Sequence, residues 1–188
     1  MNAFEIVAAG LGLVYLLFEY KASPWMWLFS ILMSGLYAYV FFLQGMYANF
    51  VLSLYNIGIS VWGGYSWVRR RQVGGDAGAI RSFPRRWWPV LVGAVVLLAP
   101  LLAWVLRWMG ESEVPLLDGL TASLSVVGIW MLAKKYYQQW FCWIVADGLY
   151  VAMFVHSGMW PSTVLYGVYV VVAVLGVQHW RRQMARTE

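Results

Sequence analysis

Charged residues are scarce in this sequence. Only 11% of its 188 residues are Asp, Glu, Lys or Arg, whereas 62% are hydrophobic. A soluble domain is usually about 25% charged. A domain this small exposes too much surface to stay in water with so few charges. The composition therefore excludes an ordinary soluble globular domain and favours an integral membrane protein.

Cysteine is nearly absent, because Cys142 is the single thiol of the chain. One thiol excludes a disulfide framework and a cysteine-rich metal site. The two histidines, His156 and His179, are isolated from each other, so we expect neither a metal nor a cofactor. The H-E-x-x-H, P-loop and G-x-S-x-G motifs and closely spaced pairs of carboxylates are missing too. We therefore expect no enzyme and no ATP-driven pump.

Long apolar runs make up most of the chain. A membrane-spanning helix needs about 20 mostly apolar residues, and short polar or glycine-containing turns separate seven such runs. The longest break is the loop from Gln72 to Pro89. The seven predicted helices cover residues 3–19, 25–43, 48–68, 88–108, 116–134, 139–156 and 160–180.

Lysine and arginine are distributed unevenly between the turns, and this predicts an orientation. If the arginine-rich loop at residues 69–86 is cytoplasmic, then Lys21, Lys134-Lys135 and the basic C-terminal tail lie on the same side. Only Arg107 disagrees. We therefore expect the N-terminus outside and the C-terminus in the cytoplasm.

The chain contains an internal repeat at a spacing of 113 residues. This shift aligns Trp27 with Trp140 and Gly63 with Gly176 without a gap. Apolar composition alone would not readily match such residues in one register. Other aligned pairs are Gly35-Leu36-Tyr37 with Gly148-Leu149-Tyr150, Gly45-Met46 with Gly158-Met159, and Trp67 with Trp180.

Each repeat holds three predicted helices, so a second copy directly after the first would be inverted. The additional helix at residues 88–108 restores the orientation. The predicted fold class is therefore an all-α integral membrane protein with seven transmembrane helices, built as two parallel three-helix repeats joined by a linking helix (3+1+3). The division is residues 1–69, 70–110 and 111–188. By analogy, the substrate site is expected at the interface of the repeats, near the membrane midplane.

Asp147 is the most informative polar residue, because a carboxylate in the middle of a membrane helix is costly and tends to mark a ligand pathway. Trp140, Trp143, Asp147 and Tyr150 follow helical spacing, so we expect them on one face of the helix. A carboxylate between indole rings suits a flat cationic ligand. The alternative is that Asp147 is protonated or bonded to a neighbouring helix.

Further candidates lie on three other predicted helices. Each also has a simpler interpretation, since small hydroxyl residues pack membrane helices together and a first-turn aspartate can cap its helix. Glu5 and Glu19, near helix ends, are expected to reach water. The candidates are Ser53 and Asn56 in a stripe with Ser60 and Gly63, Asp118 with Thr121 and Ser125, and an aromatic box of Tyr166, Tyr169 and Trp130.

These residues resemble a known family. The second repeat contains Leu117-Asp118, Lys134-Lys135, Gln139-Trp140-Phe141-Cys142-Trp143-Ile144 and Gly158-Met159-Trp160. It is similar to the PnuC family of bacterial vitamin transporters, including their W-x-x-W motif at Trp140 and Trp143. The resemblance covers most of the chain outside residues 70–87. The family's 3+1+3 fold, shared in outline with SWEET sugar transporters, agrees with the repeat.

The resemblance implies a transporter of the bacterial inner membrane that moves an unphosphorylated vitamin by facilitated diffusion, with a cytoplasmic kinase trapping it. Family members divide between nicotinamide riboside, thiamine and riboflavin. Ser53 stands where the nicotinamide riboside type often has Gln, and Asp147 where it often has Asn. These departures favour the thiamine-type branch, PnuT, with nicotinamide riboside as the alternative; both vitamins are aromatic cations, so Asp147 does not separate them.

Two other classes of protein are weighed against a transporter. A membrane enzyme or receptor could use the same aromatic cavity, but the catalytic motifs are missing. A scaffolding protein would have little use for Asp147 and the surrounding aromatic residues. The expected partners are the lipid bilayer and the vitamin, with no nucleic acid, and a homo-oligomer is compatible with the sequence.

Overall fold

The computed structural model describes the backbone of residues 3–73 and 79–186, with side chains for residues 10–69 and 79–186. These residues form seven α-helices, as predicted, with ends within five residues of the expected ones. Part of the predicted loop, residues 74–78, and the side chain of Glu5 lie outside the described residues. The helices are α1 (Ala3–Tyr20), α2 (Trp25–Leu43), α3 (Tyr47–Val73), α4 (Trp88–Met109), α5 (Pro115–Ala133), α6 (Gln139–His156) and α7 (Trp160–Ala185), with a short 3₁₀ turn η2 (Arg85–Trp87) before α4.

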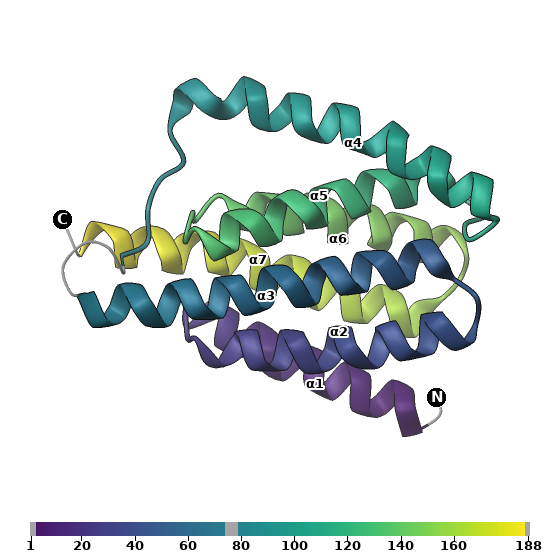
Figure 1. Cartoon of the computed structure of the whole chain (residues 1–188), viewed down its shortest axis with the longest axis horizontal. Coiled ribbons are helices and arrows are strands. Elements are labelled where there is room, and N and C mark those ends of the chain that lie inside the picture. The colour runs from purple at the N-terminus through teal and green to yellow at the C-terminus, as the bar shows by residue number, and fades with distance from the viewer. Residues whose placement is uncertain (1–2, 74–78, 187–188) are drawn as a thin grey trace. The chain divides into compact units, whose positions relative to one another are not determined.

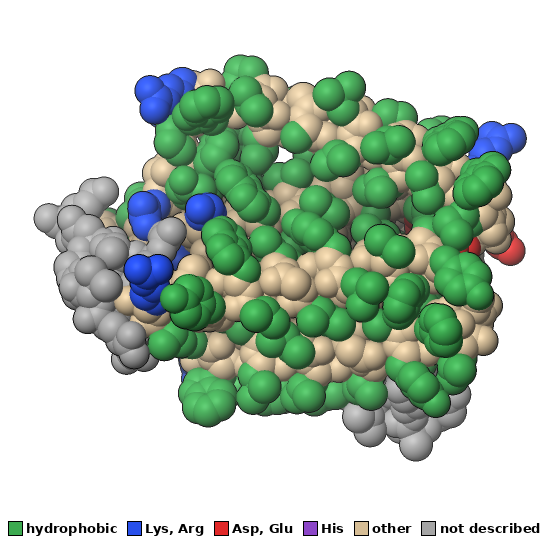
Figure 2. Space-filling model, in the orientation of Figure 1, with side chains coloured by type: hydrophobic (Ala, Val, Ile, Leu, Met, Phe, Trp, Pro, Cys, Tyr) green, Lys and Arg blue, Asp and Glu red, His purple; other side chains and the backbone are tan. Residues whose placement is uncertain are grey.

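Four of these helices, α2, α4 with its preceding turn, α5 and α7, are long and apolar enough to cross a membrane. Large apolar side chains are exposed along them, such as Leu97 and Leu116. Figure 2 shows apolar side chains along the flanks of the helices and charged ones near the helix ends. Lipid can cover such flanks, because each backbone polar group of a helix is paired inside the helix.

The chain divides into two compact units, Met1–Gly78 and Ala79–Glu188. In the first unit, α2 packs on both α1 and α3, and Figure 1 shows each of these helices running back along its neighbour. Phe18 stacks on Phe29 with ring centroids 5.3 Å apart, so α2 covers the end of α1. Glu19 beside it is only 1% exposed, and the expectation that it reaches water is wrong.

In the second unit, α5 packs on α4 and α6, and α6 packs on α7. Gly119 on α5 allows the close approach of α4, since a Cβ there would lie 2.4 Å from the carbonyl oxygen of Ala99. The linking helix α4 therefore belongs to the same compact unit as α5, α6 and α7.

The segment before α4 is fastened to the turn between α5 and α6. The backbone N–H of Arg81 donates to the Lys135 carbonyl at 2.9 Å, and that of Tyr137 donates to the Arg81 carbonyl at 3.1 Å. Phe83, buried next to this turn, makes edge contacts with Trp88, Trp130 and Tyr136, with centroids 5.2–6.4 Å away. Part of the predicted loop is thus an ordered strap.

The same contacts recur in both units at the spacing of 113 residues. Trp27 meets Trp67 edge-on at 5.6 Å, and Trp140 meets Trp180 edge-on at 5.8 Å. The turns recur as well, with left-handed backbone at Ala22 and Lys135 (φ of 49° and 60°) and at Gly45 and Gly158 (φ of 73° and 68°). The glycines of these turns adopt that conformation without the steric cost of a Cβ. Further matching pairs are Tyr37–Phe41 with Tyr150–Phe154, both stacked, and the hydrogen bonds from Met46 to Phe41 and from Met159 to Phe154.

Candidate functional site

The half-buried Trp143 ring lies where α6 packs on α5. Its indole N–H donates to Oε1 of Gln139, one turn earlier on α6. A Cβ at Gly128 on α5 would lie 3.5 Å from Cζ2 of the same ring, an ordinary contact distance, so the ring lies directly against α5. The hydrogen bond to Gln139 and the contact with α5 hold the ring in place.

Asp147 and Tyr150 continue along α6 from Trp143. The Tyr150 hydroxyl lies 3.0 Å from the Thr121 hydroxyl on α5, which shows that this part of α6 also meets α5. Asp147 is half-buried, and within the described part of the second unit no hydrogen bond or ion pair engages its carboxylate. An acceptor with that freedom can pair with a cation that arrives as a ligand.

Tyrosines from α7 extend this region. The Tyr166 ring lies 5.0 Å from Tyr150, 5.3 Å from Phe154 and 5.5 Å from Tyr169, measured between ring centroids. The structure therefore brings Tyr150 together with Tyr166 and Tyr169. The shared face of Tyr166 and Tyr169 was expected from their spacing, whereas the contact with Tyr150 was not. Such a cluster offers ring faces for stacking and hydroxyl groups for hydrogen bonds.

Trp140 departs from the face that was predicted for it. Its ring is fully buried and packs against Gly176 of α7, where a Cβ would lie 2.5 Å from Cε2 of the ring. Trp143 instead faces α5. Residues three positions apart on a helix differ by about 60° in direction, which is enough to send the two rings to different neighbours. In this conformation Trp140 has no surface left for a ligand.

Trp130 lies in a different aromatic cluster from Tyr166 and Tyr169. Its ring centroid is 6.4 Å from Phe83 and 6.3 Å from Tyr136, at the end of α5 opposite to the Thr121–Tyr150 contact. Trp130 is nine residue steps along the helix from Thr121, a distance of about 13.5 Å. The predicted box of Trp130, Tyr166 and Tyr169 therefore does not form.

Asp118 lies in the first turn of α5. Its Oδ2 accepts a hydrogen bond of 2.6 Å from the Ser112 hydroxyl, and Ser112 Oγ in turn accepts 3.1 Å from the backbone N–H of Val114. Asp118 thus fastens the loop between α4 and α5, close to the capping role weighed for it.

The hydroxyl stripe on α3 in the first unit consists largely of packing contacts. Ser60 is hydrogen-bonded to Ser30 of α2 at 2.8 Å between hydroxyl oxygens, and both are buried. Ser53 donates to the Asn49 carbonyl of its own helix at 2.9 Å. Gly63 packs on the Trp27 ring, and a Cβ at position 63 would lie only 2.6 Å from a ring carbon. Asn56 is half-buried and is the member of the stripe best suited to touch a ligand.

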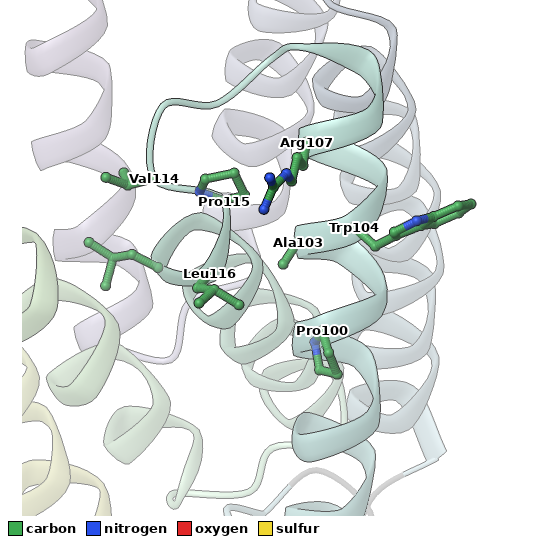
Figure 3. Close-up of a pocket in the computed structure, with 8 residues that line it drawn as sticks. Pro100, Ala103, Trp104, Arg107, Val114, Pro115 and Leu116 are labelled. Carbon is green, nitrogen blue, oxygen red and sulfur yellow. The ribbon is translucent and has the colours of Figure 1, made fainter.

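A separate open groove of about 590 Å³ lies between α4 and α5, and its lining is apolar apart from Arg107. Figure 3 shows Arg107 on α4 reaching toward Pro115 at the start of α5, whereas the Trp104 ring points outward. A cationic aromatic ligand would find no counter-charge there, and Arg107 would repel it. The Trp143–Asp147 region is therefore the better candidate site. Within the described residues, no three His, Cys, Asp or Glu side chains come together to hold a metal.

Two residues of this region were missed by reasoning from spacing. Gln139, fully buried, is bonded to Trp143, and Gly128 of α5 lies beside the ring. The signal for Gln139 was present, since an amide at the start of an apolar segment is costly to bury and calls for hydrogen-bond partners.

The sequence profile of the nicotinamide mononucleotide transporter family matches residues 2–182. This chain belongs to that family. Its members are membrane transporters, so the expectation of a transporter, and of the PnuC family, is confirmed.

Individual relatives agree. The chain is 26% identical to the nicotinamide riboside transporter PnuC of Neisseria mucosa, over 96% of this chain and 72% of that one. It is 22% identical to the PnuC of Escherichia coli, over 81% and 74%, and 23% identical to that of Haemophilus influenzae, over 98% and 92%.

A solved structure is similar over nearly the whole chain. The crystal structure of the vitamin B3 transporter PnuC superposes with a TM-score of 0.72 at 25% identity, covering 97% of this chain and 82% of that one. The relatives named above are nicotinamide riboside transporters, so the preference for thiamine drawn from Ser53 and Asp147 finds no support. The alternative, a vitamin of the B3 type, fits better.

Proposed function

We propose that the protein transports nicotinamide riboside across the bacterial inner membrane by facilitated diffusion. The observation that carries this proposal is the match to a family of such transporters along almost the entire chain. The departure at Asp147 does not oppose it, because nicotinamide riboside is a cation. An aspartate in place of an asparagine keeps the shape and adds attraction for the pyridinium ring. The departure at Ser53 has no structural explanation.

The chemistry of the second unit suits this substrate. Trp143 offers a held indole face on which a flat pyridinium can stack, and Asp147 follows one turn later on the same helix. Indole faces attract cations through the negative charge of the ring surface, by about 0.5–2 kcal/mol. Tyr150, Tyr166 and Tyr169 add rings and hydroxyls that suit a ribose. Asn56 remains a proposed contact from the first unit. The other predicted residues keep the structural contacts described above and are left out of the proposed set: Ser53, Asp118, Trp130 and Trp140.

The proposed architecture is the 3+1+3 arrangement of two parallel repeats, divided at residues 1–69, 70–110 and 111–188. It is supported by the recurrence of the Trp27–Gly63 contact as Trp140–Gly176. The basic residues at the helix ends support a cytoplasmic C-terminus and an outer N-terminus. Since no energy source is proposed for uptake, a cytoplasmic kinase would trap the riboside by adding a phosphate.

Uptake into liposomes tests the proposal. Purified protein in vesicles should equilibrate labelled nicotinamide riboside across the membrane without an ion gradient or ATP, and unlabelled riboside should compete. Empty vesicles prepared with the same lipid provide the background. A rate equal to that background, or a requirement for an ion gradient, would refute facilitated diffusion of this vitamin.

A further inference from the structure

Two adjacent glutamines at the start of α6 are both buried but are used differently. Gln138 is 4% exposed and Gln139 is fully buried. Both ends of the Gln138 amide are bonded to the strap before α4: its Oε1 accepts 2.9 Å from the Phe83 backbone N–H, and its Nε2 donates 2.8 Å to the Ser82 hydroxyl. Gln138 is therefore a structural residue.

Gln139 uses only half of its amide. Its Oε1 accepts the indole N–H of Trp143, whereas its Nε2 is buried without a hydrogen-bond partner. The amide cannot simply be turned around, because an indole N–H is only a donor and needs the oxygen opposite it. Most buried donors in proteins are paired, so this one calls for an acceptor.

Comparison of the two units shows that the helix packing they share does not require the free Nε2 donor of Gln139. The position 113 residues before Gln139 is Met26, which is also fully buried and has a side chain of similar length. In contrast, the unpaired indole N–H of Trp140 recurs at Trp27, so it belongs to the packing shared by both units. The amide of Gln139 and the Trp143 ring are additions of the second unit, since the counterpart of Trp143 is Ser30.

We propose that Gln139 is a specificity-determining residue of the substrate site, whose Nε2 donates a hydrogen bond to the carboxamide oxygen of the vitamin. This inference rests on the proposed function. A pyridinium ring that stacks on Trp143 carries its carboxamide at the edge of the ring. Gln139 is bonded to the edge of the same indole. Its remaining donor is covered in this conformation, so the proposal requires the side chains at that edge of the ring to move apart when the ligand binds.

Binding titrations with two ligands test this. The first is nicotinamide riboside, and the second is N-ribosylpyridinium, which has the same charge and sugar but no carboxamide. The wild type should bind the first about tenfold more tightly, which is the size expected for one hydrogen bond to a buried group. Gln139→Met, the residue used in the first unit, should remove this tenfold preference. Gln138→Met is the matched control and should retain it.

The outcomes are distinct. If the wild type binds both ligands equally, or if Gln139→Met keeps the preference, then Gln139 makes no bond to the carboxamide and the inference is overturned. Equal weakening of both ligands by Gln139→Met would show that the residue acts only through Trp143, which also overturns it. If the wild type binds neither ligand, the proposed function itself fails.

Discussion

Alanine at Gly176 should loosen the packing of α7 on α6. The new Cβ would lie 2.5 Å from Cε2 of the Trp140 ring, well inside the contact distance of about 3.5–4.0 Å between carbon atoms. The ring is fully buried, with Trp180 edge-on at 5.8 Å. Relieving this overlap therefore requires the ring or the two helices to shift.

The expected magnitude combines two opposing effects. Overfilling a packed site costs about 1–3 kcal/mol, while alanine is better than glycine inside a helix by about 1 kcal/mol. The net loss of stability should be about 0–2 kcal/mol, or up to roughly 8 °C in melting temperature for a chain of this length. Gly63→Ala in the first unit should behave in the same way, because its Cβ would lie 2.6 Å from the Trp27 ring.

The chain offers matched controls. A Cβ at Gly35 or at Gly148, which are also related by the 113-residue spacing, would meet nothing within 4 Å. Alanine at these two positions should leave the protein unchanged or stabilise it slightly. Thermal unfolding of the four variants in detergent is the assay. If Gly176→Ala melts at the same temperature as Gly148→Ala, then the Trp140–Gly176 contact does not hold α6 and α7 together and the reasoning fails.

Three further predictions concern the second unit. Asp147→Asn should weaken nicotinamide riboside binding about tenfold with an unchanged melting temperature, because it removes the counter-charge at nearly constant shape; unchanged affinity in a titration would remove Asp147 from the site. Trp140→Ala should destabilise the protein by about 3–5 kcal/mol through the cavity it leaves, and a melting temperature like that of the wild type would contradict the packing role. Gln138→Leu should raise hydrogen exchange at the backbone N–H of Phe83, whose acceptor is lost, while leaving riboside affinity unchanged; unaltered exchange there would show that the strap is held by other contacts.

The helices themselves could be predicted from the sequence. Runs of about 20 apolar residues between charged or glycine-containing turns give their ends, and α2 begins and ends where it was predicted. The alignment of Trp27 with Trp140 and of Gly63 with Gly176 also predicted positions that share a structural role. A large ring that packs against a glycine requires both residues, so each unit carries a Trp and a Gly at matching positions of its sequence.

The partners of individual side chains could not be predicted in the same way. Helical spacing gives the direction of Trp140 relative to Trp143, but it does not say that α7 lies in one direction and α5 in the other. The strap around Phe83 lies in a stretch without helical periodicity, so no pattern in the sequence predicts that Phe83 packs against Trp130. Glu19 is buried because α2 folds back over the end of α1, which depends on tertiary packing.

The central claim is that this protein binds and carries a vitamin of the B3 type. Side-by-side titration of the purified wild type with nicotinamide riboside, thiamine and riboflavin tests it most directly. We expect saturable binding of nicotinamide riboside that is at least tenfold tighter than that of the other two vitamins. Tighter binding of thiamine or riboflavin, or no binding of nicotinamide riboside, would contradict it.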